Sequence, residues 1–115
     1  MVGNGGTAGT VSISGVTIQK GKVTYPDTGG GIFNAGTLTL DSSTVTGNSA
    51  PNLDGGGINS EGPLTLTNST VSGNSADSGG GVYVGGPTTI TNSTISNSSA
   101  RLGGGSFVSG TSTLT

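Results

Sequence analysis

The sequence contains no cysteine and no histidine, and aromatic and charged residues make up only 3% and 7% of its 115 residues. Without cysteine, disulfide bonds and thiolate metal sites are excluded, and no redox compartment is indicated. No histidine or cysteine is available as base or nucleophile, and serine is too frequent for one residue to be singled out, so enzyme activity is not expected. The net charge is −2 with no basic cluster, which excludes the usual footprint of a nucleic-acid-binding protein. No stretch approaches the roughly 18 apolar residues of a membrane span.

Glycine is the residue that the chain has in excess, with 25 copies, and it marks a repeat. Closely similar segments begin at Gly29, Gly55, Gly79 and Gly103, at intervals of 26, 24 and 24 residues. A fixed period in this range is typical of a solenoid. A diverged first coil begins near Gly9. The sequence therefore predicts one solenoid domain over residues 9–115, after a loose lead-in over residues 1–8.

Apolar residues recur at matched positions and form columns when the coils are stacked. Around them, apolar and polar residues alternate with period 2, as in residues 64–67 (LTLT), which is typical of strands rather than helices. We therefore expect an all-β fold, a parallel β-helix of about four and a half coils of 24–26 residues, with three short strands in each coil. The expected columns are Ile32, Ile58 and Val82; Ile13, Leu40, Leu66, Ile90 and Leu114; Ile18, Val45, Val71 and Ile95; and a narrow one of Ala50, Ala76 and Ala100.

Glycine clusters and Asn-Ser segments separate the expected strands. Glycine permits the positive φ angles and the close backbone approach that corners require. Asn48 and Asn74 are expected to stack at one corner, and Asn68 and Asn92 at another. Stacked asparagines can bond to the backbone and to each other, so we interpret both pairs as structural ladders.

The segments 45–58 (VTGNSAPNLDGGGI) and 71–83 (VSGNSADSGGGVY) resemble the repeats of chlamydial polymorphic outer membrane proteins and of autotransporter-type bacterial surface adhesins. That family pairs a Phe-x-x-Asn box with a Gly-Gly-Ala-Ile box. This chain has valine for the phenylalanine, keeps the asparagine and has glycine for the alanine, at Val45, Val71, Asn48, Asn74, Gly57 and Gly81. The resemblance covers roughly residues 9–115. It implies a right-handed β-helix on an exported protein, extracellular or at a bacterial cell surface.

Acidic side chains offer one candidate for metal chemistry. Asp27, Asp54 and Asp77 each lie shortly before a GGG segment, and Arg101 follows one coil later. Pectate-lyase-type β-helices, which the chain resembles in this respect, use aspartate clusters for calcium and an arginine as base. Calcium needs several converging oxygen ligands, so the alternative is a set of solvated turn acids. No two acids of one coil suggest the facing pair that glycoside hydrolysis requires, and we predict neither a metal nor a cofactor.

Threonine is ordered on the expected outer faces, where residues two apart share a face and each coil repeats them at ~4.8 Å. Regular Thr-x-Thr arrays resemble the ice-binding faces of β-solenoid antifreeze proteins. The alternative is that threonine is a strand-forming residue whose hydroxyls pair between coils. The candidate ice-binding face consists of Thr39, Thr65, Thr67, Thr89, Thr91 and Thr113.

The repeat and the resemblance together indicate a structural or adhesive protein, with surface glycans or host matrix as outside partners. We see no capping element in the sequence, and uncapped solenoid ends expose strand edges and core. If the 115 residues are the whole mature chain, we expect copies to join head to tail into a filament; the alternative is a segment of a longer adhesin. The residues expected at the junction are Val11, Ile13, Ile18, Phe107, Leu114 and Thr115.

Overall fold

The computed structural model describes residues 9–108 and 112–114, with side chains described as far as residue 105, and all regular structure in them is β. The strands are β1 (Thr10–Ser14), β2 (Thr17–Gln19), β3 (Ile32–Asn34), β4 (Thr37–Asp41), β5 (Thr44–Thr46), β6 (Ser49–Asp54), β7 (Ile58–Ser60), β8 (Leu64–Thr67), β9 (Thr70–Ser72), β10 (Ser75–Ser78), β11 (Val82–Val84), β12 (Thr88–Thr91), β13 (Thr94–Ser96), β14 (Ser99–Leu102), β15 (Ser106–Val108) and β16 (Ser112–Leu114).

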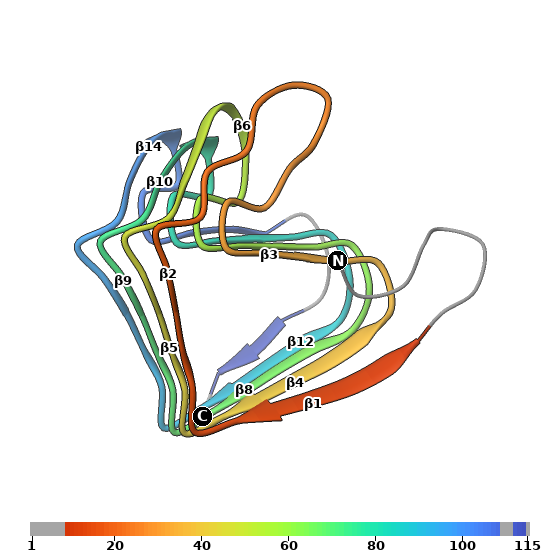
Figure 1. The fold of residues 1–115 in the computed structure, drawn as a ribbon. Helices are drawn as coiled ribbons and strands as arrows, with labels where there is room; N and C mark the ends of the chain where they lie inside the picture. The colour runs from red at the N-terminus through yellow and green to blue at the C-terminus, as the bar shows by residue number, and fades with distance from the viewer. Residues whose placement is uncertain (1–8, 109–111, 115) are drawn as a thin grey trace.

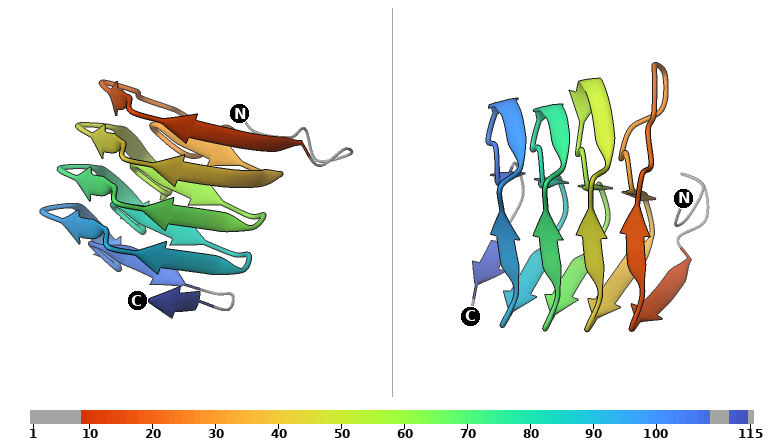
Figure 2. Two further views of the ribbon diagram at one scale, coloured as in Figure 1. Left: turned by 90° about the horizontal axis from the view of Figure 1, so that it is seen from below. Right: turned by 60° about the vertical axis from the view of Figure 1, so that its left-hand side comes forward.

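These strands stack into four parallel sheets that run along the axis of a solenoid of about four turns (Figure 1). Sheet A contains β3, β7, β11 and β15; sheet B contains β1, β4, β8, β12 and β16; sheet C contains β2, β5, β9 and β13; and sheet D contains β6, β10 and β14. Viewed along the axis, the chain turns clockwise as it recedes, which makes the helix right-handed (Figures 1 and 2). The predicted parallel β-helix is confirmed.

Each full coil has four strands, whereas the sequence predicted three. The additional strand belongs to sheet D, whose inward position carries only alanine. The register nevertheless pairs Ala50 with Ala76 and Ala76 with Ala100, as the narrow fourth column requires. A strand with one small apolar residue gives little alternation, which is why the segment looked like a corner.

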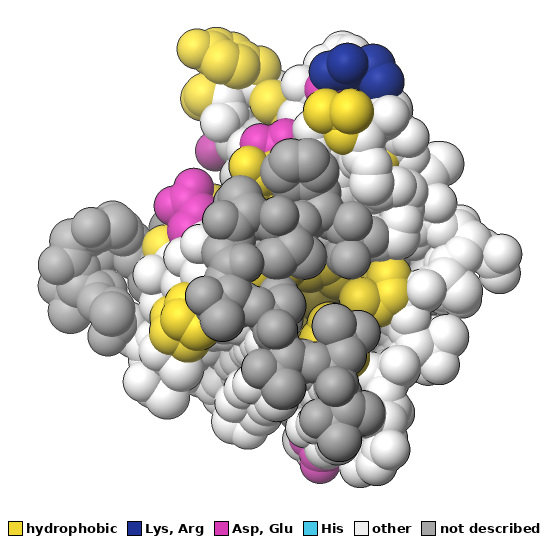
Figure 3. Space-filling model, turned by 180° about the vertical axis from the view of Figure 1, so that it is seen from behind, with side chains coloured by type: hydrophobic (Ala, Val, Ile, Leu, Met, Phe, Trp, Pro, Cys, Tyr) yellow, Lys and Arg dark blue, Asp and Glu magenta, His cyan; other side chains and the backbone are white. Residues whose placement is uncertain are grey.

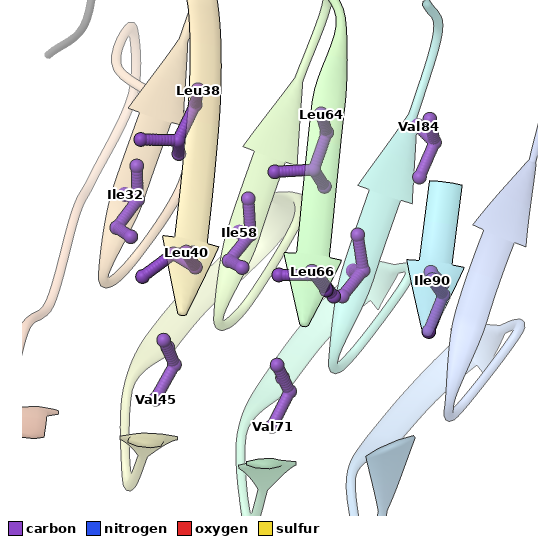
Figure 4. Close-up of a cluster of buried hydrophobic side chains, with 11 residues drawn as sticks. Ile32, Leu38, Leu40, Val45, Ile58, Leu64, Leu66, Val71, Val84 and Ile90 are labelled. Carbon is purple, nitrogen blue, oxygen red and sulfur yellow. The ribbon is translucent and has the colours of Figure 1, made fainter. Parts of the chain in front are cut away.

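The interior is a narrow stack of aliphatic side chains, shown in Figure 4. Sheet B pairs Leu40 with Leu66 and Leu66 with Ile90, and the other columns repeat in the same way. Leu40, Ile58 and Leu66 are fully buried. All four predicted columns lie in register within the described strands. Stacking like residues over like residues allows a chain with few large apolar side chains to build a continuous core.

Three positions in the repeat turn the corners, and the residues there have positive φ. The corner between sheets B and C uses Gly15, Ser42, Asn68 and Asn92, the corner between C and D uses Lys20, Gly47, Gly73 and Asn97, and the return from D to A uses Gly29, Gly55, Gly79 and Gly103. Glycine and asparagine tolerate this conformation better than other residues. The corners therefore explain the Gly and Asn-Ser periodicity of the sequence.

Sheet D and the glycine run that follows it form a hook on one side of the solenoid (Figure 2). In coil two the hook comprises residues 49–57. A Cβ at Gly56 would overlap the backbone carbonyl oxygens of Ser75 and Gly80, so the returning chain needs glycine there. Strand β6 has six residues and β10 has four, with a register shift between them. The two extra residues explain why coil two is 26 residues long and the next ones 24.

Candidate functional site

Asn48 and Asn74 form a buried ladder at the corner between sheets C and D, as predicted. The Oδ1 atom of Asn74 accepts hydrogen bonds from the backbone N of Asn48 at 2.9 Å and from its Nδ2 at 3.1 Å. Asn48 Oδ1 in turn accepts from the backbone N of Gly21 at 2.8 Å. In coil four, Ser98 takes the same place, and its Oγ accepts from Asn74 N at 3.3 Å. These bonds join one coil to the next.

A second ladder, at the corner between sheets B and C, is built from serines and was not predicted. Ser69 Oγ accepts from Ser43 N at 3.2 Å, and Ser93 Oγ accepts from Ser69 N at 3.0 Å. The neighbouring Asn68 and Asn92, expected to form this ladder, are exposed and hold the corner through their positive φ angles. Serine is so frequent in the chain that its position alone gave no signal.

Both ladders have a direction, because the backbone N–H of one coil donates to a side chain of the next. The first coil donates in the same way, from Val16 N to Ser43 Oγ at 3.3 Å and from Gly21 N to Asn48 Oδ1. At the acceptor positions, however, the first coil carries Val16 and Gly21, which have no side-chain acceptor. This coil can therefore bond to the coil that follows it, but it offers no ladder acceptor to a coil placed before it.

The three aspartates of the predicted acidic corner do not align. Asp54 is in register with Ser78 rather than with Asp77, and Asp27 lies in the loop before β3. Asp77 accepts from Arg101 Nε at 2.9 Å and from Nη2 at 3.1 Å. This hydrogen bond lowers the pKa of Asp77 and raises the pKa of Arg101. The described residues contain no group of three or more acidic, His or Cys side chains that could hold a metal ion.

The threonines of sheet B form two ranks on its outer face. The register places Thr39, Thr65 and Thr89 in one rank with Ser12, and it pairs Thr67 with Thr91 in the other. Asp41 precedes Thr67 in the second rank. Ser12 and Thr89 are exposed, and the other described members are half-buried. Thr113 continues the first rank on β16, where its side chain is not described. Figure 3 shows how few charged side chains lie on the visible surface.

The outer face of sheet A differs from the Ser/Thr faces of sheets B and C. Its middle positions are Phe33, Asn59 and Tyr83, which are paired in register, and Phe107 of β15 follows Tyr83. A cavity of ≈440 Å³ opens beside Phe33. The loop between β2 and β3 forms its other wall; the lining residues are Val23, Pro26, Asp27, Thr28, Gly29, Gly30, Gly31 and Phe33. This column was not predicted from the sequence, although each member is the second residue after a GGG segment.

The ends of the described stack leave strand edges open. At the N-terminal end, β1 and β2 are the outermost strands, while sheets A and D start one coil later. At the C-terminal end, β15 and β16 extend one strand beyond sheets C and D. Val11 is 36% exposed at the first edge, and Ile13 and Ile18 are partly buried against the core. Of the other residues expected at a junction, Phe107 and Leu114 lie on β15 and β16, and Thr115 lies outside the described residues.

Comparison with known proteins identifies no relative. No protein-family model, curated protein or solved structure matches the chain significantly. Within the described residues, no helix has the length and apolar character needed to cross a membrane. The assignment of the chain as a repetitive parallel β-solenoid therefore rests on the order and register of its strands.

Proposed function

We propose that this protein is a structural, adhesive component of an extracellular or bacterial cell surface, of the kind found in autotransporter-type adhesins, and that copies associate end to end. The observation that carries the proposal is the constant register of the strands in sheet B. Sheet B joins five parallel strands without a register shift. A parallel edge of this kind is a template for a further strand of the same pattern.

The extents of the sheets decide which strands can meet in such a contact. Sheet B protrudes at both ends, with β1 at one and β16 at the other. When two copies share one axis, β16 meets β1 of the next copy before any other pair of sheets closes. Continuing the register would set Leu114 opposite Ile13 and Thr113 opposite Ser12. The proposed junction is therefore a single shared sheet, in which β16 of one copy pairs with β1 of the next.

The ladders make this junction weaker than a contact between coils of one chain. Ser93 and Ser98 supply acceptors to coil three, but Val16 and Gly21 of a second copy would return none. Each missing hydrogen bond of this type removes about 0.5–1.5 kcal/mol. We expect association to depend on protein concentration, with copies that separate on dilution.

A proline in the free edge of β1 tests this association. The bonds from Thr37 N to Gly9 O and from Gly15 N to Asp41 O show that odd-numbered residues of β1 face β4. The N–H of Ser12 therefore points to the open edge. Ser12→Pro should abolish concentration-dependent association in light scattering and leave the thermal midpoint within a few degrees, because an edge strand tolerates proline there. Ser12→Thr is the matched control and should associate like the parent. Association that survives Ser12→Pro contradicts a junction through sheet B.

The two threonine ranks favour ice binding as a second candidate function. Thr65 and Thr89 lie side by side on a flat parallel sheet, and Thr67 and Thr91 repeat the arrangement. Replacing both Thr65 and Thr89 by tyrosine would break the regular surface without entering the core, because both side chains face outward. If the face binds ice, the parent shows thermal hysteresis and the double variant loses nearly all of it. A parent solution without thermal hysteresis rules this function out.

A further inference from the structure

Strands β13 and β14 form an open edge, because they are the outermost strands of sheets C and D within the described residues. Thr94 N donates to Ser69 O at 2.9 Å, and Ser96 O accepts from Gly73 N at 3.3 Å, so both β13 residues turn their backbone groups toward β9. Backbone groups alternate along a paired strand, so the N–H and C=O of Ile95 point to the open edge. Such an edge is a template for one more strand.

Both hydrogen-bond ladders reach this edge with a donor. In the serine ladder, Ser69 N donates to Ser93 Oγ at 3.0 Å, so the next donor in the series is Ser93 N. In the asparagine ladder, Asn74 N donates to Ser98 Oγ at 3.3 Å, and the next donor is Ser98 N. Neither N–H has an acceptor within the described part of the chain. The edge therefore presents two directed donors besides the backbone groups of β13.

The inward column of sheet C is also incomplete at this edge. Val45 and Val71 are each 1% exposed, because the strand that follows each of them covers its side chain. Ile95 is the next residue of the same column and is only partly buried. A strand added to β13 would complete the burial of Ile95 if it brought an apolar side chain to this position.

These features define the side chains that a strand needs at this edge. They are a hydrogen-bond acceptor, an apolar residue two positions later, and a second acceptor three positions after that. Residues 43–48 (STVTGN) and 69–74 (STVSGN) have this pattern, and both segments make these contacts within the solenoid. Residues 16–21 (VTIQKG) of the first coil have the apolar residue but neither acceptor. The edge therefore favours a segment like those of the inner coils over the chain's own first coil.

From these observations we propose that the edge of β13 and β14 binds an extended segment of another polypeptide chain with the pattern Ser-x-Val/Ile-x-x-Asn/Ser, which adds to sheet C as a further parallel strand. In this mode of recognition, main-chain hydrogen bonds give affinity and alternate side chains give specificity. The sheet B junction leaves this place open, because sheet B extends to β16 whereas sheet C ends at β13. The inference goes beyond the proposed function, since the partner is a different segment and both contacts can form on one molecule.

Fluorescence anisotropy of a labelled peptide tests the site on the full chain. The probe has the sequence of residues 67–78 (TNSTVSGNSADS) and should bind saturably. Replacing its Ser69 and Asn74 by alanine removes both acceptors and should weaken binding about tenfold or more, the size expected for the loss of two hydrogen bonds. A peptide of residues 14–25 (SGVTIQKGKVTY), the matching segment of the first coil, lacks both acceptors and should bind as weakly as the double-alanine peptide.

Disulfide trapping tests the register of the bound probe. The chain has no cysteine, so Ser96→Cys places a single thiol on the outer side of β13. The proposed register sets the probe's Ser72 position opposite Ser96, as in the pairing of β9 with β13. A probe with cysteine at that position should form a disulfide bond with the variant. A probe with cysteine at its Thr70 position lies two residues away, about 6.6 Å along the strand, and should not.

The outcomes separate this proposal from end-to-end association. Absence of saturable binding, or equal binding by the probe and its double-alanine form, overturns the site. Equal trapping of the two cysteine probes overturns the parallel register and with it the proposal. Ser12→Pro changes the opposite end of the solenoid, in sheet B, so it should bind the probe as the parent does even where it no longer associates. A parent that associates without binding the probe contradicts this inference alone.

Discussion

Replacing Asn74 by alanine is expected to lower the free energy of unfolding by about 3 kcal/mol. The side chain is 1% exposed, and its Oδ1 accepts from both nitrogen donors of Asn48 while its Nδ2 donates to Val45 O at 3.0 Å. Alanine removes all three bonds and leaves the backbone N–H of Asn48 and the carbonyl of Val45 buried without these partners. Each buried group left unsatisfied costs ~1–3 kcal/mol.

Two companion variants define what the measurement means. Asn74→Ser should be less destabilising than Asn74→Ala. At the same position of coil four, Ser98 Oγ accepts a hydrogen bond from the backbone N of Asn74 in the preceding coil. Asn68→Ala changes an exposed asparagine with φ of 49°, so it should cost only the ~1–2 kcal/mol of placing alanine in that conformation. Urea denaturation followed by circular dichroism measures all three. Equal destabilisation by Asn74→Ala and Asn68→Ala would contradict a buried ladder.

Replacing Gly56 by alanine is expected to cost at least 3 kcal/mol and to prevent folding in a chain of ordinary stability. The added Cβ would overlap two carbonyl oxygens, one from Ser75 and one from Gly80, and lie 2.6 Å from the carbonyl carbon of Ser75. All these atoms are backbone, so no side-chain rotation relieves the overlap, and the effect lies at or above the upper end for overpacked sites, about 3 kcal/mol.

Gly47→Ala is the matched control for this prediction. Gly47 has φ of +64° and nothing within 4 Å of its ideal Cβ. Alanine there meets only the conformational cost of ~1–2 kcal/mol. The thermal midpoint should therefore fall much further for Gly56→Ala than for Gly47→Ala. If the two variants melt together, the hook does not return against the neighbouring coil as described.

The repeat made the architecture predictable from the sequence, since a fixed period and matched apolar positions determine which residues face inward. Ile13 was assigned to the column of Leu40, and the register confirms it. The fourth strand could not be recognised, because Ala50 is its only inward apolar residue and the outer positions give no alternation. The hook that contains this strand depends on close backbone contacts between glycines of different coils. Such contacts cannot be predicted from the residue pattern within one coil.

Candidate sites were harder to predict because they depend on neighbours in other coils. Asn48 and Asn74 were identified, since asparagine is distinctive at a corner and recurs one coil apart. The serine ladder was not, because serine is frequent everywhere in the chain. Phe33, Asn59 and Tyr83 share a column, but the amide of Asn59 interrupts the aromatic residues. A comparison that looks for similar residues at matched positions therefore does not detect the column. Asp54 and Asp77 appeared aligned only because the two extra residues of β6 were not placed within a strand.

Cysteine cross-linking on the outer face of sheet B tests the central claim, the in-register parallel stacking of the coils, most directly. The chain has no cysteine, so a pair can be introduced without background. Thr65 and Thr89 are register partners on adjacent strands, at the ~4.8 Å spacing that permits a disulfide bond. Thr39 and Thr89 share the rank but lie two strands apart, ~9.6 Å, which is too far. Thr65→Cys/Thr89→Cys should oxidise completely within the monomer, and Thr39→Cys/Thr89→Cys should keep free thiols. Equal oxidation of the two pairs, or none in the first, would contradict the stacking.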